Sequence, residues 1–270
     1  MNRTSGARWC ATVAVGALSL ALLTGCADSG SDGSKDSKGS KGSDSSAAPA
    51  QKALGTAELQ KLLIAQGDVD GYEVKSPDAQ LPASKSEVKV DKAECEPLAY
   101  AMSGLAPGES AGDARTMATQ KKSPTDTASQ SMEDMTEGEF EDAFSDALSI
   151  DMTAIGLSSY EGDGTAATFT SVSDAITACA GGFTLTTKGT AQKVVEVATE
   201  KGSGTGDESV AFSASVEMEG QDAPGTVHAE VVRHGGTLTT YYTINMGALL
   251  TGKAYEIPAP VVQAQAAKLK

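Results

Sequence analysis

The motif Leu23-Thr24-Gly25-Cys26 carries the clearest chemistry in this sequence. It has the form of a bacterial lipobox, in which small residues fit a signal peptidase and the cysteine supplies a thiol. We expect that thiol to receive diacylglycerol, after which cleavage leaves Cys26 as an N-terminus that also carries palmitate or a similar acyl chain. The alternative is an ordinary secretory signal with an incidental cysteine.

The segment before this motif is typical of a signal peptide. Arg3 and Arg8 precede an apolar run from Ala11 to Leu23, which is shorter than the roughly 20 residues of a membrane-spanning helix. We therefore predict that residues 1–25 are a lipoprotein signal peptide. The mature chain would then lie on the outer face of a Gram-positive-type cell membrane, anchored through Cys26.

Two cysteines remain for the mature chain, Cys95 and Cys179, because Cys10 leaves with the signal and Cys26 is lipidated. In an oxidising compartment, two cysteines most simply pair with each other. A free reactive thiol and a metal-binding pair are the alternatives. We predict the disulfide because it needs no further ligands.

The sequence contains no convincing catalytic motif. Gly-x-Ser-x-Gly is absent, and Ser86 with Lys89 matches a Ser-x-x-Lys pattern that often arises by chance and lacks its companion motifs here. An envelope hydrolase would need Ser86, Asp207 and His228 within hydrogen-bond reach of one another. We therefore predict no catalytic residue, no cofactor and no enzyme activity.

Three groups of polar residues have some features of metal sites. His228 and Glu230 would share one face of a predicted strand, Asp68-Val69-Asp70-Gly71 begins like a calcium loop, and an acidic run extends from Glu133 to Asp146. The calcium pattern fails after its first residues, so a turn is expected there. A half-exposed strand face and a solvated loop explain the other two groups more simply. We predict no metal site.

Two further features are expected to be structural. His234 lies in a predicted turn, where we expect it to be solvated. The glycine-rich segment Gly202–Gly206 lacks the following lysine and the strand-to-helix context of a phosphate-binding loop. We assign neither of them a ligand.

The charge of the chain limits its partners. The formal net charge is −15, and removal of a signal with two arginines and no acidic residue brings the mature chain to −17. Such a chain repels nucleic acid and anionic lipid headgroups, so neither is an expected partner. Acidity that keeps an exported protein soluble is the simpler explanation, with a preference for cationic ligands as the alternative.

Residues 26–53 are rich in Gly, Ser, Lys and Asp, with few residues able to form a core. We predict a disordered tether whose flexible part spans about 30 Å. Order should begin near Leu54, and residues 54–270 are expected to form a single α+β domain, an antiparallel sheet with helices packed on it.

The elements of this domain are predicted from hydrophobic spacing and turn chemistry. Helices are expected at 56–65 behind a Thr56 cap, at 95–102, at 165–180 and from Pro258 onward. Strands are expected at 72–75, 88–90, 114–121, 183–187, 192–199, 209–217, 227–233 and 237–245, the last two joined by a tight turn at Gly235-Gly236. Residues 123–138 are interpreted as a loop, and the ambiguous segment 140–160 as a strand over 145–159.

Several segments resemble the extracellular sensor domain of PknH-type Ser/Thr kinases, a domain also found in stand-alone actinobacterial lipoproteins. They are residues 59–63, 69–72, 94–98, 178–179, 206–212 and 231–238. The resemblance implies a curved, largely antiparallel sheet with helices and a cleft, stabilised by disulfides and proposed to bind an undefined ligand. This chain departs from the family in having one candidate disulfide instead of two, no kinase, and no tryptophan after the signal.

Two functions fit these features. The first is a lipid-anchored, non-catalytic binding or sensor-like domain for a small molecule or cell-envelope component, which requires a concave pocket of a few hundred Å³. The second is a scaffolding lipoprotein acting on a membrane-protein partner, which requires an exposed apolar patch or an unprotected edge strand.

Overall fold

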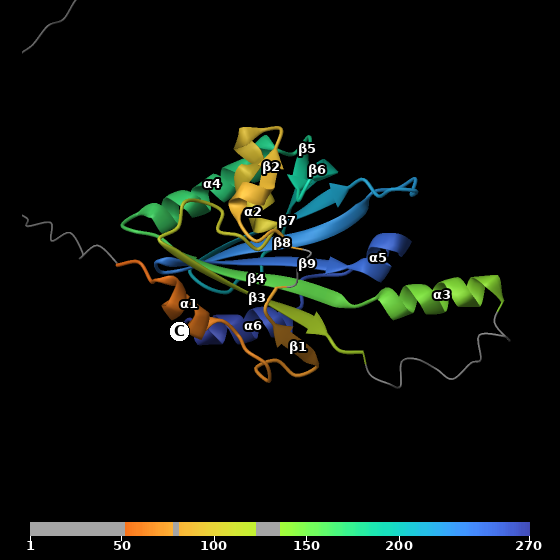
Figure 1. Ribbon diagram of the computed structural model, residues 1–270, viewed down its shortest axis with the longest axis horizontal. Helices are drawn as coiled ribbons and strands as arrows, with labels where there is room; N and C mark the ends of the chain where they lie inside the picture. Colours follow the sequence, from red (N-terminus) through yellow and green to blue (C-terminus); the bar gives the residue numbers. More distant parts are fainter. Residues whose placement is uncertain (1–51, 78–80, 123–135) are drawn as a thin grey trace, which may run out of the picture. The chain divides into compact units, whose positions relative to one another are not determined.

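The computed structural model describes residues 52–77, 81–122 and 136–270 (Figure 1). The lipobox, Cys26 and the predicted tether up to residue 51 lie outside the described residues. Most of the predicted loop at 123–138 lies outside them as well. In the part of the chain that is described, no helix is both long enough and apolar enough to cross a membrane.

One antiparallel sheet of nine strands organises the described residues, in the order β1-β3-β4-β9-β8-β7-β6-β5-β2. The strands are β1 (Tyr72–Lys75), β2 (Val88–Val90), β3 (Gly112–Gln120), β4 (Asp151–Ser159), β5 (Phe183–Thr187), β6 (Thr190–Glu200), β7 (Glu208–Val216), β8 (Gly225–His234) and β9 (Thr237–Asn245). The helices are α1 (Thr56–Leu62), α2 (Glu96–Ala101), α3 (Glu137–Leu148), α4 (Gly164–Ala178), α5 (Met246–Thr251) and α6 (Ala259–Lys268). The predicted α+β class with an antiparallel sheet is confirmed.

Helices cover both faces of the sheet, with α2 and α4 on one side and α1 and α6 on the other (Figure 1). Consequently the central strand β8 has buried apolar residues on both faces. Val231 of β8 belongs to the core under α2 and α4, whereas Val232 belongs to the core under α1 and α6. Successive residues of a strand point to opposite faces, so one short Val-Val pair serves both cores.

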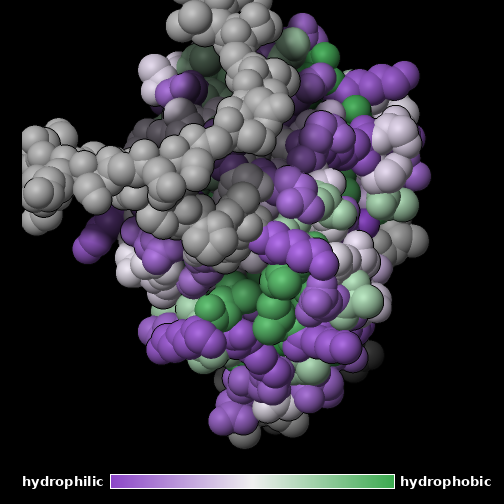
Figure 2. Space-filling view, turned by 90° about the vertical axis from the view of Figure 1, so that its left-hand side faces the viewer, coloured by the Kyte–Doolittle hydropathy of each residue, from purple (hydrophilic) through white to green (hydrophobic). Residues whose placement is uncertain are grey.

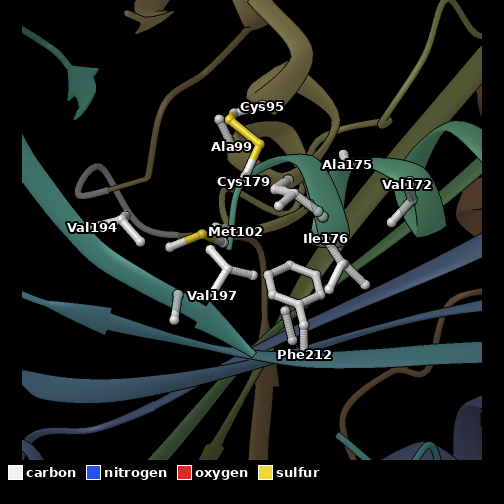
Figure 3. Packing of buried hydrophobic residues seen from close by; sticks show 14 of the residues in the cluster. Cys95, Ala99, Met102, Val172, Ala175, Ile176, Cys179, Val194, Val197 and Phe212 are labelled. Carbon is white, nitrogen blue, oxygen red and sulfur yellow. A yellow bond between two sulfur atoms is a disulfide. The ribbon is translucent and has the colours of Figure 1, made fainter. Parts of the chain in front are cut away.

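The core under α2 and α4 is built around a disulfide between Cys95 and Cys179, both fully buried. It joins the start of α2 to the end of α4, and Met102 and Ile176 lie between it and the sheet (Figure 3). Phe212 of β7 projects from the sheet toward Ile176. The helix predicted at 165–180 is confirmed as α4, with Val172 and Ile176 both buried.

The second core depends on a buried glutamine. Gln265 of α6 is fully buried, and its Nε2 donates to Leu62 O at 2.8 Å while its Oε1 accepts from Ile64 N at 3.0 Å. Leu62 is the last residue of α1 and Ile64 lies two residues beyond it, in the region where backbone carbonyls lack helical partners. The side chain therefore joins the two helices of this layer across about 200 residues of sequence.

The sequence prediction was wrong in part of the segment 140–160. Residues 137–148 form α3, and the strand begins only at Asp151, so the predicted strand over 145–159 is too long at its start. Leu148, Ile150 and Met152 are spaced two residues apart across the end of α3, and this spacing resembles that of a strand. The short α5 was also missed, and α1 is capped by Gly55 rather than by Thr56.

The predicted hairpin between β8 and β9 is confirmed. His234 pairs with Thr237, so Gly235-Gly236 is a two-residue connection, and Gly235 has a positive φ of 57°. Tight hairpin turns of this length need such a backbone conformation, which glycine adopts without strain. Figure 2 shows that the part of this side of the molecule not covered by grey atoms is mostly hydrophilic, with a group of hydrophobic residues near the middle and a few others toward the upper right.

Candidate functional site

The strand β7 has two very different faces. On the face under α2 and α4 it presents hydrophobic side chains: Val210, Phe212, Ala214 and Val216. On the opposite face it presents only small ones: Ser209, Ala211, Ser213 and Ser215. Because the apolar core under α1 and α6 extends over β3, β4, β9 and the end of β8, this small-residue surface is left as a hollow.

That hollow is a cleft of about 750 Å³. Its floor is formed by β7 and β8, one wall by residues 200–205 and the other by residues 254–263. We call it the β7–β8 cleft. A second hollow of about 680 Å³ adjoins it toward the β8–β9 turn, and the two share Thr205 and Gln263 in their linings. A concave surface of this size meets the requirement for binding a small molecule.

Glu230 is a nearly inaccessible carboxylate in the floor of the cleft, only 2% exposed. Its Oε1 accepts hydrogen bonds from both Ser203 N and Ser203 Oγ at 2.7 Å. Burial raises the pKa of this carboxyl above its ordinary value, and the hydrogen bonds from Ser203 and Ser209 act in the opposite direction. One side chain thus fixes the glycine-rich loop at the rim of the cleft.

His228 lies beside Glu230 on the same face of β8 and makes a close pair with Glu200. Its Nδ1 is 2.9 Å from Glu200 Oε2 and 3.1 Å from Oε1. A carboxylate only accepts hydrogen bonds, so this contact assigns the proton to Nδ1. The imidazole is 12% exposed and Glu200 is 33% exposed. The pair lies where the cleft meets solvent.

Tyr255 completes this part of the site from the opposite wall. Its ring meets the His228 ring edge to face, with centroids 4.6 Å apart, a favoured arrangement of aromatic rings. Its hydroxyl donates to Thr226 O at 2.8 Å, with Thr243 O at 3.3 Å. Burial raises the pKa of this phenol, so it stays a hydrogen-bond donor at neutral pH. Apolar residues follow it along the wall: Ile257, Ala259 and Val262.

Glycines allow the loop between β6 and β7 to pass close to the sheet. A Cβ on Gly202 would lie 2.5 Å from Ser209 Oγ and 3.1 Å from Glu230 Oε1. A Cβ on Gly206, which has a φ of +71°, would lie 2.4 Å from Arg233 O. The glycine-rich segment is therefore a closely packed rim of the cleft.

The structure does not assemble the catalytic cluster of Ser86, Asp207 and His228. Asp207 lies beside the β8–β9 turn, where it accepts a hydrogen bond from Gly235 N at 2.7 Å. This position is six residues along the strand ladder from His228, which corresponds to about 20 Å. Ser86 precedes β2, four strands from β8, and its hydroxyl bonds Ser84 Oγ at 2.8 Å. The three side chains cannot act together on one bond.

The metal candidates occupy different surroundings. His228 and Glu230 do share a face, but Glu230 is buried rather than half-exposed, so the sequence interpretation of that face was wrong. Asp68 lies in a turn after α1, as expected, and accepts from Ala65 N and from Lys268 Nζ, each at 2.7 Å. These contacts lower the pKa of Asp68. Among the described residues, no group of three His, Cys, Asp or Glu side chains could hold a metal ion.

His234 differs from its expectation. It is half-buried instead of solvated, its Nε2 is buried without a hydrogen-bond partner, and burial lowers its pKa. Sequence reasoning also missed Ser203, Tyr255 and the buried state of Glu230. The alternation of small and large residues along β7 was the signal that could have located the cleft.

The sequence matches no family model and no curated protein. Among solved structures, a similar chain is the extracellular domain of PknH from Mycobacterium tuberculosis, with 12% sequence identity and a TM-score of 0.44. The match covers 81% of this chain and 95% of that chain. The likeness is distant and concerns the fold alone.

Proposed function

We propose that this chain is a lipid-anchored, extracytoplasmic binding protein that captures a small molecule or cell-envelope component in the β7–β8 cleft without transforming it. The cleft carries the proposal. Its volume of about 750 Å³ suits a small molecule, and the paired His228 and Glu200 give it polar groups held in place. The lipobox supports the location, since acylated Cys26 would hold the domain outside the membrane.

A non-catalytic role is supported by how these polar groups are used. The Glu230 carboxylate accepts hydrogen bonds from Ser203, and the Tyr255 hydroxyl donates to backbone carbonyls. His228 has a carboxylate partner in Glu200, but the candidate nucleophile Ser86 lies far away. A site that positions polar groups without pairing a base to a nucleophile suits recognition better than group transfer.

The scaffolding alternative has less support. The edge strands β1 and β2 contain four and three residues, which offer a partner strand few hydrogen bonds. Among the described residues, the exposed large hydrophobic side chains are Phe144 of α3 and Met246 at the start of α5, at 53% and 37%. Two such residues make a small patch compared with a protein interface.

Native mass spectrometry of the full chain purified from its own cell envelope tests the proposal. We expect a copurifying mass that is absent from Ala254→Trp, because Ala254 is an exposed residue of the cleft wall, where an added indole would obstruct ligand binding. Ala191→Trp, at an exposed position of β6 outside the cleft, should keep the mass. A mass retained by both variants, or absent from the wild-type chain, would contradict capture in the cleft.

A further inference from the structure

We propose that the β7–β8 cleft selects ligands in which a protonated amine adjoins an apolar group. This inference deepens the proposed function and rests on it. It follows from the different chemistry of the two walls of one cavity, which together prescribe a ligand with a cationic head and a hydrophobic body.

The polar wall is rich in hydrogen-bond acceptors. Glu200, Glu230 and Glu256 line the cleft, against a single ammonium group from Lys201. Of these, Glu200 is both accessible to a ligand, at one-third exposed, and held in place by His228, whereas Glu230 is almost completely buried and bonded to Ser203. Carboxylates held in position lose little conformational entropy when they accept from an ammonium group, and such charge-assisted hydrogen bonds are the strong ones.

The pairing of His228 with Glu200 maintains this negative character. An imidazole whose one proton lies on Nδ1 has an acceptor at its other ring nitrogen. The Glu200 carboxylate also keeps lone pairs for a further donor, since one N–H occupies only part of its capacity. Tyr255 adds an aromatic face beside the pair, and a ring face attracts a cation.

The wall formed by residues 254–263 is largely apolar, apart from Tyr255, Glu256 and Gln263. Ile257 and Val262 are partly or fully buried side chains that line the cleft, and Ala254 and Ala259 have no polar side-chain atoms. A hydrophobic group of the ligand that covers this wall gains burial free energy of about 25 cal/mol per Å². An anionic ligand would instead place its charge near the desolvated Glu230 carboxyl, which is unfavourable.

Three probes of nearly equal size separate charge from shape: phenethylamine, phenethyl alcohol and hydrocinnamate. Ligand-observed NMR would measure their binding to the full chain in detergent. We expect phenethylamine to bind with a Kd of about 1 mM, as fits a small fragment. It should bind at least about tenfold more tightly than the alcohol, and hydrocinnamate should bind weakest.

Variants locate the charge. Glu200→Gln should weaken phenethylamine about tenfold and leave the alcohol unchanged, and because Glu200 is one-third exposed the fold should persist. Glu161→Gln, an exposed glutamate before α4 and outside the cleft, is the matched control and should change neither affinity.

Equal binding of the amine and the alcohol, lost in Ala254→Trp, would overturn the amine preference and leave capture in the cleft standing. Tightest binding of hydrocinnamate, or unchanged amine binding in Glu200→Gln, would also overturn it. If no probe binds at about 10 mM, the amine inference fails, while the copurification experiment decides the binding function separately.

Discussion

Glu200 at the end of β6 reaches over β7 to within 2.9 Å of His228 Nδ1 on β8. Between the two side chains, β7 places only Ala211 and Ser213 on this face, so no bulky side chain separates the pair. The same small residues leave the floor of the cleft open. The contact that fixes the histidine and the cavity that would hold a ligand thus have one cause in the sequence of β7.

Membrane attachment is expected to depend on one thiol. Cys26→Ala removes the atom that receives diacylglycerol, so the protein should move from the membrane fraction to the soluble or secreted fraction. Cys10→Ala is the matched control, because this cysteine is expected to leave with the signal peptide. Fractionation followed by immunoblotting measures the change, and membrane retention of Cys26→Ala would argue against lipidation.

The disulfide should stabilise the fold substantially. Cys95 and Cys179 close a loop with a sequence separation of 84. In the chain-entropy model, removing such a link lowers the free energy of unfolding by about 4–5 kcal/mol. Urea denaturation of wild type and of the Cys95→Ala/Cys179→Ala double variant measures the loss. Reductant should destabilise the wild type and leave the double variant unaffected. Labelling of both thiols by an alkylating reagent without reductant would show that the bond is absent.

Glu230 should give stability a distinctive pH dependence. Burial raises its pKa in the folded state, so between the folded and unfolded values the native protein binds more protons than the unfolded chain. Its contribution therefore becomes more favourable as pH falls, and less favourable as pH rises through the folded pKa.

Glu230→Gln removes this titration. Thermal unfolding of both proteins is measured at about pH 7 and about pH 5. The Tm of the wild type, relative to the Tm of Glu230→Gln, should be higher at the lower pH. Glu161→Gln, at an exposed site, should follow the wild type at both pH values. A wild-type advantage that shrinks toward low pH would mean that the folded-state pKa is lowered instead.

Gln265 should matter far more than its neighbour on α6. Gln265→Ala leaves Leu62 O and Ile64 N without their partners, which should lower the free energy of unfolding by about 2–4 kcal/mol. Gln263→Ala makes the same chemical change at an exposed position and should cost less than about 0.5 kcal/mol. Urea unfolding of both variants measures the difference. Equal stabilities would show that the buried glutamine does not join the two helices.

Most of the fold could be predicted from the strand and hairpin patterns in the sequence. Alternation along β7 and β8, and the Gly235-Gly236 connection, are local signals, and local signals can be read without knowing the partners. The prediction for the residues before Asp151 was wrong because α3 ends only a few residues before β4 begins. The helical and strand spacings of apolar residues therefore overlap in the sequence. The environment of Glu230 could not be predicted, since its burial depends on Ser203, which lies 27 residues away in sequence.

The sequence indicated only part of the site. His228 and Glu230 drew attention as neighbours on one face, but their partners Glu200 and Ser203 belong to another strand and its loop. Tyr255 follows α5, a helix that the sequence did not reveal. Pairing of β6, β7 and β8 brings these residues together, so chemistry at the site depends on strand register more than on any motif.

Hydrogen exchange measured on envelope-purified protein, before and after its copurified ligand is stripped, tests the central claim most directly. If the β7–β8 cleft is the binding site, the retained ligand should slow exchange in peptides covering residues 200–206 and 254–263. Exchange in α3 and in β1 should stay the same. Protection confined to those distant elements, or no protection anywhere, would contradict a binding site in the cleft.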